Sequence, residues 1–103
     1  MKNIKIIECT DKEYPQKLLK IDKNPEKLYA LGNIELLHKD SLAIVGAREC
    51  TPYGAKNAKE FAKVISKKDI CIVSGMAIGI DTFAHLGALK EKGKTIAVLR
   101  SRI

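Results

Sequence analysis

Cysteine and histidine are scarce in this chain of 103 residues. The three cysteines are odd in number, lie far apart and form no Cys-x-x-Cys pair, and there are two histidines. A disulfide framework normally shows an even set of cysteines, and a structural zinc site needs about four ligands close together. The sequence therefore predicts a reduced, metal-free protein of the cytoplasm. The residues concerned are Cys9, Cys50, Cys71, His38 and His85.

Long apolar runs are also missing. No stretch approaches the ~20 apolar residues that a membrane-spanning helix needs. Residues 1–5 include two lysines and lack the apolar core of a secretory signal peptide. We therefore expect neither a membrane span nor secretion.

Negative charge is in short supply relative to positive charge. The chain has 19 Lys and Arg residues against 12 Asp and Glu residues, a formal net charge of +7, with 46% hydrophobic residues. This composition is typical of a globular domain rather than a disordered chain. The excess of positive charge favours contact with a polyanion, either nucleic acid or an anionic membrane surface. A lysine-rich surface can also serve solubility alone, so charge by itself decides nothing further.

The first 40 residues differ from the rest of the chain in how apolar and charged residues alternate. Their short apolar groups, broken by charges, predict short strands near residues 4–7 and 28–31. Between them Pro15 occupies a first-turn position and opens a short helix. We interpret residues 1–40 as a lead-in segment that forms a single compact domain with the region that follows.

Residues 41–103 alternate between apolar runs and helical patterns. The expected strands are 42–45, 70–73 and 95–99, and the expected helices are 52–67, capped by Thr51 and burying Phe61, and 80–92. Such alternation predicts parallel strands joined by right-handed crossovers, and continuous apolar runs are typical of strands covered on both faces. The predicted fold class is α/β, a Rossmann-like βαβαβ half with helices flanking a parallel sheet in three layers.

Two glycine-containing loops follow the first two of these strands. Gly46 ends the first strand, and Gly75 and Gly79 bracket the loop after the second. Ligands of such folds lie beyond the carboxyl ends of the strands, where helix N-termini favour anions. Arg48, in the first loop, has a fork of donors that suits a phosphate. The loops thus predict a phosphate cleft, while the same glycines are equally compatible with tight strand-to-helix turns alone.

The two loops carry patterns that resemble the two signatures of the DNA-processing protein A (DprA/Smf) family. The first signature corresponds to IVGAR at 44–48 with TxYG at 51–54, and the second to SGMAIGID at 74–81 with AH at 84–85 and AL at 88–89. The family's lead-in corresponds to YPxxL at 14–18 and LYxxGN at 28–33, and its next strand to TIAVL at 95–99. The resemblance places the chain in the N-terminal part of the family's Rossmann-like domain. Because the family continues with a glycine-rich turn where this chain reads RSRI at 100–103, the sheet is expected to stop after its third core strand.

The resemblance implies a binder of single-stranded DNA that acts without regard to sequence. Such proteins protect incoming DNA and help to load the RecA recombinase during natural transformation and recombination, with no cofactor and no catalytic turnover; self-association into a homo-oligomer is left open. The phosphate-contacting residues carried over are Gly46, Arg48, Thr51, Ser74, Gly75 and Gly79. Asp81 and His85 are expected to shape the site, and Tyr53 either stacks on a base or packs against its helix.

Other interpretations compete with this one. Ser74, Asp81 and His85 suggest a catalytic triad, but no nucleophile-elbow signature positions Ser74, so an enzyme is not expected. A phosphoribohydrolase-like, nucleotide-processing enzyme would need Asp81 as its carboxylate, and an inactive truncated fragment is the third alternative. The lysines at 56, 59, 63 and 67 share one helix face, which is either solvated or follows a DNA backbone.

Overall fold

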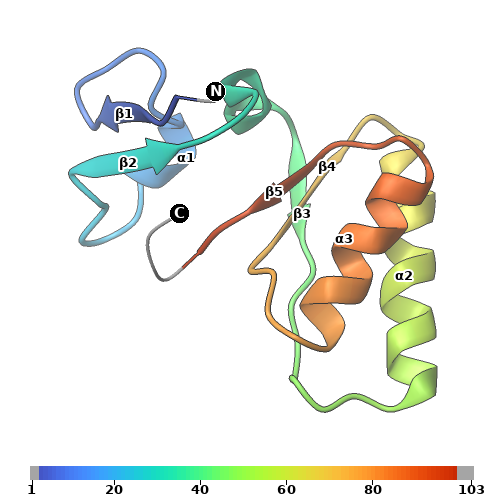
Figure 1. Cartoon of the computed structure of the whole chain (residues 1–103). Coiled ribbons are helices and arrows are strands. Elements are labelled where there is room, and N and C mark those ends of the chain that lie inside the picture. Colours follow the sequence, from blue (N-terminus) through green and yellow to red (C-terminus); the bar gives the residue numbers. More distant parts are fainter. Residues whose placement is uncertain (1–2, 100–103) are drawn as a thin grey trace. The chain divides into compact units, whose positions relative to one another are not determined.

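The structure is a computed structural model that describes residues 3–99, and it divides the chain into two compact units, residues 1–39 and 40–103. The boundary lies one residue from the expected one. Each unit has a sheet of its own (Figure 1). That the two units form a single compact domain stays a prediction.

Unit 1 is built on a two-stranded antiparallel sheet. Strand β1 (Lys5–Glu8) pairs with β2 (Lys27–Ala30), and the short helix α1 (Gln16–Leu19) lies between them in sequence, as predicted. Tyr14 is 1% exposed; its hydroxyl donates to the Pro25 carbonyl at 2.7 Å and thereby holds the long connection between the strands. A 3-10 helix, η1 (Ile34–His38), follows where no element was predicted.

Unit 2 holds a three-stranded parallel sheet. Its strands are β3 (Ser41–Ala43), β4 (Cys71–Ser74) and β5 (Thr95–Ala97), in the order β3-β4-β5. The connecting helices are α2 (Pro52–Ser66) and α3 (Ile80–Lys90). The predicted strand-helix-strand-helix-strand order is confirmed, although the first and third strands are shorter than their apolar runs.

Helices α2 and α3 pack closely because small residues line their contact. A Cβ atom on Gly87 would meet the Cβ of Ala62 at 2.9 Å, so the absence of a side chain there lets the helices approach. Ala62, Ala84 and Ala88 are fully buried around Ile72 of β4. The prediction that Phe61 is buried was wrong: it is 61% exposed, because the narrow alanine seam takes the place of a wide apolar stripe.

Both helices cover the same face of the sheet, since both pack against Ile72 (Figure 1). This follows from right-handed crossovers between strands that are neighbours in sequence order. On the other strands Leu42 is 42% exposed and Val98, after β5, 62% exposed, so these apolar runs are not covered on both faces as expected. The parallel sheet with flanking helices is confirmed, while a third layer would need a helix on the second face, which the described part of unit 2 does not provide.

Candidate functional site

The two predicted glycine loops lie at the same end of unit 2. Residues 44–51 connect β3 to α2, and residues 75–79 connect β4 to α3. Because β3 and β4 are parallel neighbours, both loops leave the sheet at its carboxyl edge, where both helices begin (Figure 1). We call this end of unit 2 the glycine-loop edge.

One carboxylate joins the two loops. Asp81 Oδ1 accepts from the Gly46 N–H at 3.2 Å, and Asp81 Oδ2 accepts from the Gly75 N–H at 3.0 Å. Asp81 lies in the first turn of α3 and is 7% exposed. The two hydrogen bonds lie in a part-buried site, and hydrogen bonds to a charged acceptor are among the stronger ones. Asp81 therefore holds the two loops in one arrangement.

Gly79 is the second point where the loops touch. Its φ of +99° lies in the region that L side chains rarely adopt, and a Cβ there would run into the carbonyl oxygens of Ala47 and Arg48. Directly after it, the Ile80 N–H donates to the Ala47 carbonyl at 3.2 Å. Gly79 is therefore required by close backbone contact between the loops.

Several residues predicted to contact phosphate use their polar groups in hydrogen bonds within the protein. The Ser74 hydroxyl donates to the Ile44 carbonyl at 2.6 Å, and Thr51 Oγ1 accepts from the Gly54 N–H at 3.0 Å as the N-cap of α2. The N–H groups of Gly46 and Gly75 are taken by Asp81. These residues build the edge, and their contact with a phosphate stays a prediction.

Arg48 and Tyr53 differ from these residues because their side chains face solvent. Both side chains are exposed, Tyr53 by 76%, and Arg48 makes no hydrogen bond or ion pair within residues 3–99. The loop after β4 adds two exposed apolar side chains that the sequence analysis missed, Met76 at 61% and Ile78 at 78%. Their exposure could have been predicted from the sequence, because apolar residues in a loop bracketed by glycines lie outside the helices and strands that form the core.

The suggested catalytic triad is not assembled. His85 is 8% exposed, and its Nδ1 lies 2.7 Å from the hydroxyl of Thr95. The Thr95 hydroxyl donates its single proton to the Ile72 carbonyl at 2.8 Å. His85 Nδ1 must therefore be protonated and donate to the Thr95 oxygen. The other ring nitrogen, Nε2, is buried without a partner among the described residues. No described hydrogen bond joins Ser74 to His85 or to Asp81.

Burial lowers the pKa of His85 from its ordinary value of 6.5, and the nearby Asp81 carboxylate raises it by a smaller amount. Desolvation disfavours the charged imidazolium, and a proton on Nε2 would find no acceptor in the described chain. A depressed folded pKa means that below pH 6.5 the unfolded chain binds this proton more readily than the folded one.

We therefore expect the stability contributed by neutral His85 to be complete above pH 6.5 and lost as the pH falls through the folded pKa. The loss reaches at most about 1.4 kcal/mol for each pH unit between the unfolded and folded values. Urea unfolding of the wild type and of His85→Gln between about pH 7 and about pH 5 measures it. Parallel pH profiles for the two proteins would contradict the assignment.

The described residues were also compared with the requirements of a metal site and of a membrane-spanning helix. Among the described residues no group of three or more His, Cys, Asp and Glu side chains could hold a metal ion. In residues 3–99 no helix has the length and apolar character to cross a membrane.

Known proteins resemble this chain over almost its whole length. The model of the family DNA recombination-mediator protein A matches residues 5–103. The DNA processing protein DprA of Streptococcus pneumoniae is 43% identical over 86 residues, which are 84% of this chain and 30% of that protein.

Solved structures show the same relationship. The crystal structure of DNA processing protein A from S. pneumoniae superposes with a TM-score of 0.86 at 39% identity, covering 93% of this chain and 34% of that one. DNA processing protein A from Helicobacter pylori, whose structure addresses its single-stranded DNA binding mode, gives a TM-score of 0.76 at 32% identity, over 96% and 45% of the two chains. The chain spans about a third of the length of the curated relatives that it matches. The Rossmann-like fold and the resemblance noted in the sequence are confirmed.

Proposed function

The chain belongs to the DNA recombination-mediator protein A family, and from this premise we propose that its glycine-loop edge binds the backbone of single-stranded DNA without regard to sequence. The exposure of Arg48 and Tyr53 beside two braced loops is the observation that carries the proposal. Exposed cationic and aromatic groups held on a rigid support are what single-strand binding uses.

Each side chain has a separate role in this proposal. The Arg48 guanidinium binds a backbone phosphate, and the Tyr53 ring stacks on a base, which is tolerant of sequence because every base has a π-face. The contacts through Asp81 and Gly79 keep the loop of Arg48 in place, so that little conformational entropy is lost on binding. The net charge of +7 adds a general attraction to the polyanion.

A nucleotide-processing enzyme is disfavoured by the position of its candidate carboxylate. Such an enzyme would need Asp81 to face a substrate, but Asp81 is buried and both of its oxygens accept backbone N–H groups. We therefore propose a binding function without turnover and without a cofactor. Support of DNA protection and of RecA loading in the cytoplasm, and self-association, belong to the same proposal as properties of the longer family proteins.

Arg48→Ala is expected to weaken single-strand binding about tenfold in low salt, because a charge-assisted contact to phosphate is lost. The slope of log K against log salt should become shallower by about 0.7 for one lost phosphate contact. Fluorescence anisotropy of a labelled oligonucleotide, single-stranded and double-stranded, across a salt series measures both quantities.

Two variants serve as controls for this experiment. Arg48→Lys keeps the charge but loses the planar fork, so the salt slope should be retained while part of the affinity is lost. Lys12→Ala removes the same charge from an exposed position in unit 1 and should change little. Equal losses in Arg48→Ala and Lys12→Ala would show that Arg48 acts only through net charge, which contradicts the proposed site.

A further inference from the structure

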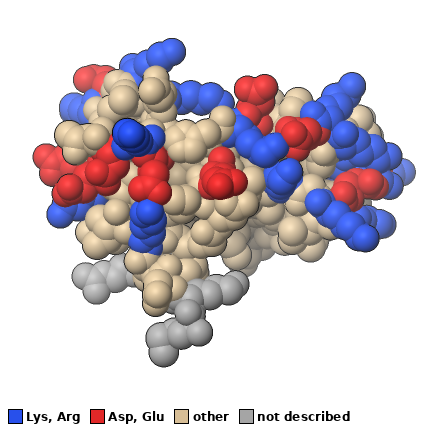
Figure 2. Space-filling model, turned by 90° about the horizontal axis from the view of Figure 1, so that it is seen from above, with Lys and Arg blue, Asp and Glu red and all other residues tan. Residues whose placement is uncertain are grey.

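The opposite end of unit 2, where α2 and α3 end and β4 and β5 begin, is rich in lysine. We call residues 63–69 and 90–94 the lysine end. Seen from above, Lys and Arg side chains gather over the part of the molecule that carries α2 and α3 (Figure 2). The lysine end contains two acidic residues, Asp69 and Glu91, and six lysines: Lys63, Lys67, Lys68, Lys90, Lys92 and Lys94.

The two carboxylates of the lysine end are already engaged. Glu91 Oε1 lies 3.7 Å from Lys63 Nζ, and Asp69 Oδ1 lies 3.2 Å from Lys94 Nζ. Within the part of the chain that the structure describes, the remaining four lysines have no carboxylate partner. The lysine end therefore presents uncompensated positive charge.

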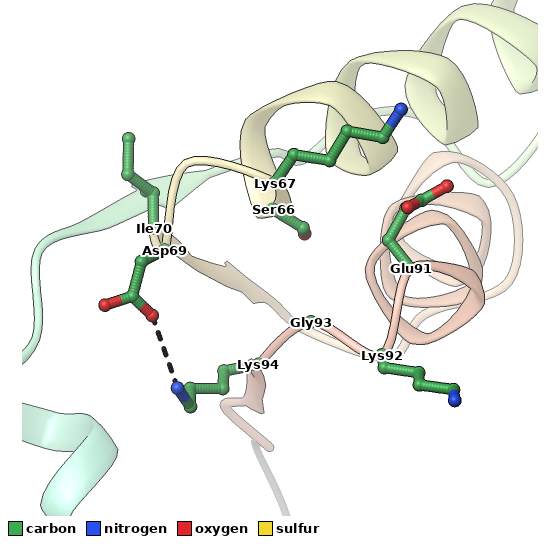
Figure 3. A pocket seen from close by; sticks show the side chains of 8 residues that line it. All are labelled: Ser66, Lys67, Asp69, Ile70, Glu91, Lys92, Gly93 and Lys94. Atoms are coloured by element: carbon green, nitrogen blue, oxygen red, sulfur yellow. Dashed lines mark hydrogen bonds and ion pairs between the residues drawn. The ribbon is translucent and has the colours of Figure 1, made fainter.

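A cavity of about 250 Å³ opens among these side chains. It is lined by the lysine-end residues Ser66, Lys67, Asp69, Glu91, Lys92, Gly93 and Lys94 together with Ile70 (Figure 3). Ser66 is 9% exposed, and its Oγ has no hydrogen-bond partner among the described groups. In Figure 3 the Ser66 side chain turns into the space between Gly93 and the β4 segment, while Lys67 and Lys92 flank Glu91.

Helix dipoles account for only part of this pattern. Cations in the last turn of a helix are stabilised by the partial negative charge there, which explains Lys63 of α2 and Lys90 of α3. The same dipoles do not explain why Lys67 and Lys92, in the following turns, line a cavity together with a buried hydroxyl that lacks an acceptor. A buried hydroxyl without a partner is costly, and a polar cavity of about 250 Å³ has room for several water-sized groups, such as the oxygens of a phosphate.

We propose that this cavity is a second contact site for nucleic-acid phosphate, at which Lys67 and Lys92 supply the charge and the Ser66 hydroxyl donates a hydrogen bond. The proposal rests on the proposed function, because it places a second contact for the same strand. Helix α2 has 15 residues and so separates the two ends of unit 2 by about 22 Å. A strand long enough to reach both ends is held at two points, which raises its apparent affinity by effective concentration.

Oligonucleotide length separates the two sites experimentally. The probes are a single strand of about four nucleotides, which at roughly 3.4 Å per nucleotide falls short of the distance between the two ends, and one of about 30 nucleotides, which exceeds it. Lys67→Gln combined with Lys92→Gln should weaken binding of the long strand about tenfold, flatten its salt slope by about 1.4, and leave the short strand nearly unaffected. The matched control Lys12→Gln with Lys20→Gln removes the same charge from exposed positions in unit 1.

Ser66→Ala tests the hydroxyl with no change in charge. If Ser66 Oγ is unpartnered in the free protein and donates to bound phosphate, its removal should weaken long-strand binding several-fold without lowering the unfolding midpoint. A lower midpoint with unchanged binding would show that the hydroxyl serves the fold alone, which contradicts its role as a donor.

The outcomes distinguish this inference from the proposed function. Unchanged long-strand binding in the Lys67 and Lys92 variant, or a loss equal to that of the unit 1 control, overturns the second site. Equal losses for the short and long strands overturn it as well, since they would place the lysines at a single site. If Arg48→Ala leaves short-strand binding intact, the glycine-loop site fails independently of the result at the lysine end.

Discussion

Gly79→Ala is expected to destabilise unit 2 by about 3 kcal/mol or more, which is a large fraction of the roughly 5–15 kcal/mol by which a typical domain is stable. Two costs combine at this position. The φ of +99° is strained for any L side chain, and the added Cβ would overlap the carbonyl oxygens of Ala47 and Arg48, which are backbone atoms that a rotamer change cannot move. Urea unfolding followed by circular dichroism measures the loss.

Gly32→Ala separates the two costs. Gly32 also has a positive φ, +112°, but a Cβ there meets no atom within 4 Å. It should therefore lose only the backbone term, about 1–2 kcal/mol. Equal losses in the two variants would contradict the close contact between the loops, whereas a markedly larger loss at Gly79 supports it.

Asp81→Ala is the second change with a large expected effect. It leaves the N–H groups of Gly46 and Gly75 without their acceptor in a part-buried site, and a loss of about 3 kcal/mol is expected for two hydrogen bonds to one charged group. Asp81→Asn keeps the shape but can accept only through its single carbonyl oxygen, so it should fall between the wild type and alanine. Glu60→Gln, on the exposed side of α2, removes one carboxylate from the same unit and should cost under about 0.5 kcal/mol.

The Asp81 variants also connect stability with binding. With the loops no longer tied, the chain around Arg48 gains freedom that DNA must remove, so single-strand affinity should fall even at temperatures where the variant stays folded. Anisotropy titrations of Asp81→Asn well below its melting temperature test this. Native affinity in a variant of reduced stability would mean that the Asp81 bridge serves the fold and has no part in placing Arg48.

Much of unit 2 could be predicted because its signals are local. Thr51 followed by Pro52 marks the start of α2, and the helix begins there with the Thr51 side chain as its cap. The strand-helix alternation likewise depends on short-range periodicity. The prediction for Phe61 was wrong because helical spacing shows which residues share a face but not how wide the buried part of that face is. In this structure the buried part of the α2 face is narrow, because Gly87 lets α3 approach closely.

The position of the candidate site could be predicted from the sequence, but the contacts that hold its two loops together could not. Proximity of the loops follows from parallel strand order alone, so Gly46, Arg48 and Gly75 were correctly expected at one edge. The bridge from Asp81 to Gly46 spans 35 positions in sequence, and no local pattern shows which backbone groups a carboxylate will meet. Of the lysine end, only Lys63 and Lys67 were placed by the sequence analysis, on one helix face, because the cavity needs α2, α3 and both following turns together.

By itself the sequence determined the family, the α/β order of unit 2, the positive charge and the two loops that meet at the carboxyl edge of the sheet. These depend on residue type and spacing along the chain. The tertiary structure alone decided that Asp81 and Gly79 join the loops, that Ser74 and Thr51 use their oxygens inside the chain, and that Arg48 and Tyr53 remain exposed. The physical reason is that a hydrogen bond or a close backbone contact depends on separation in space, which the packing of α3 against the sheet sets and the order of residues does not.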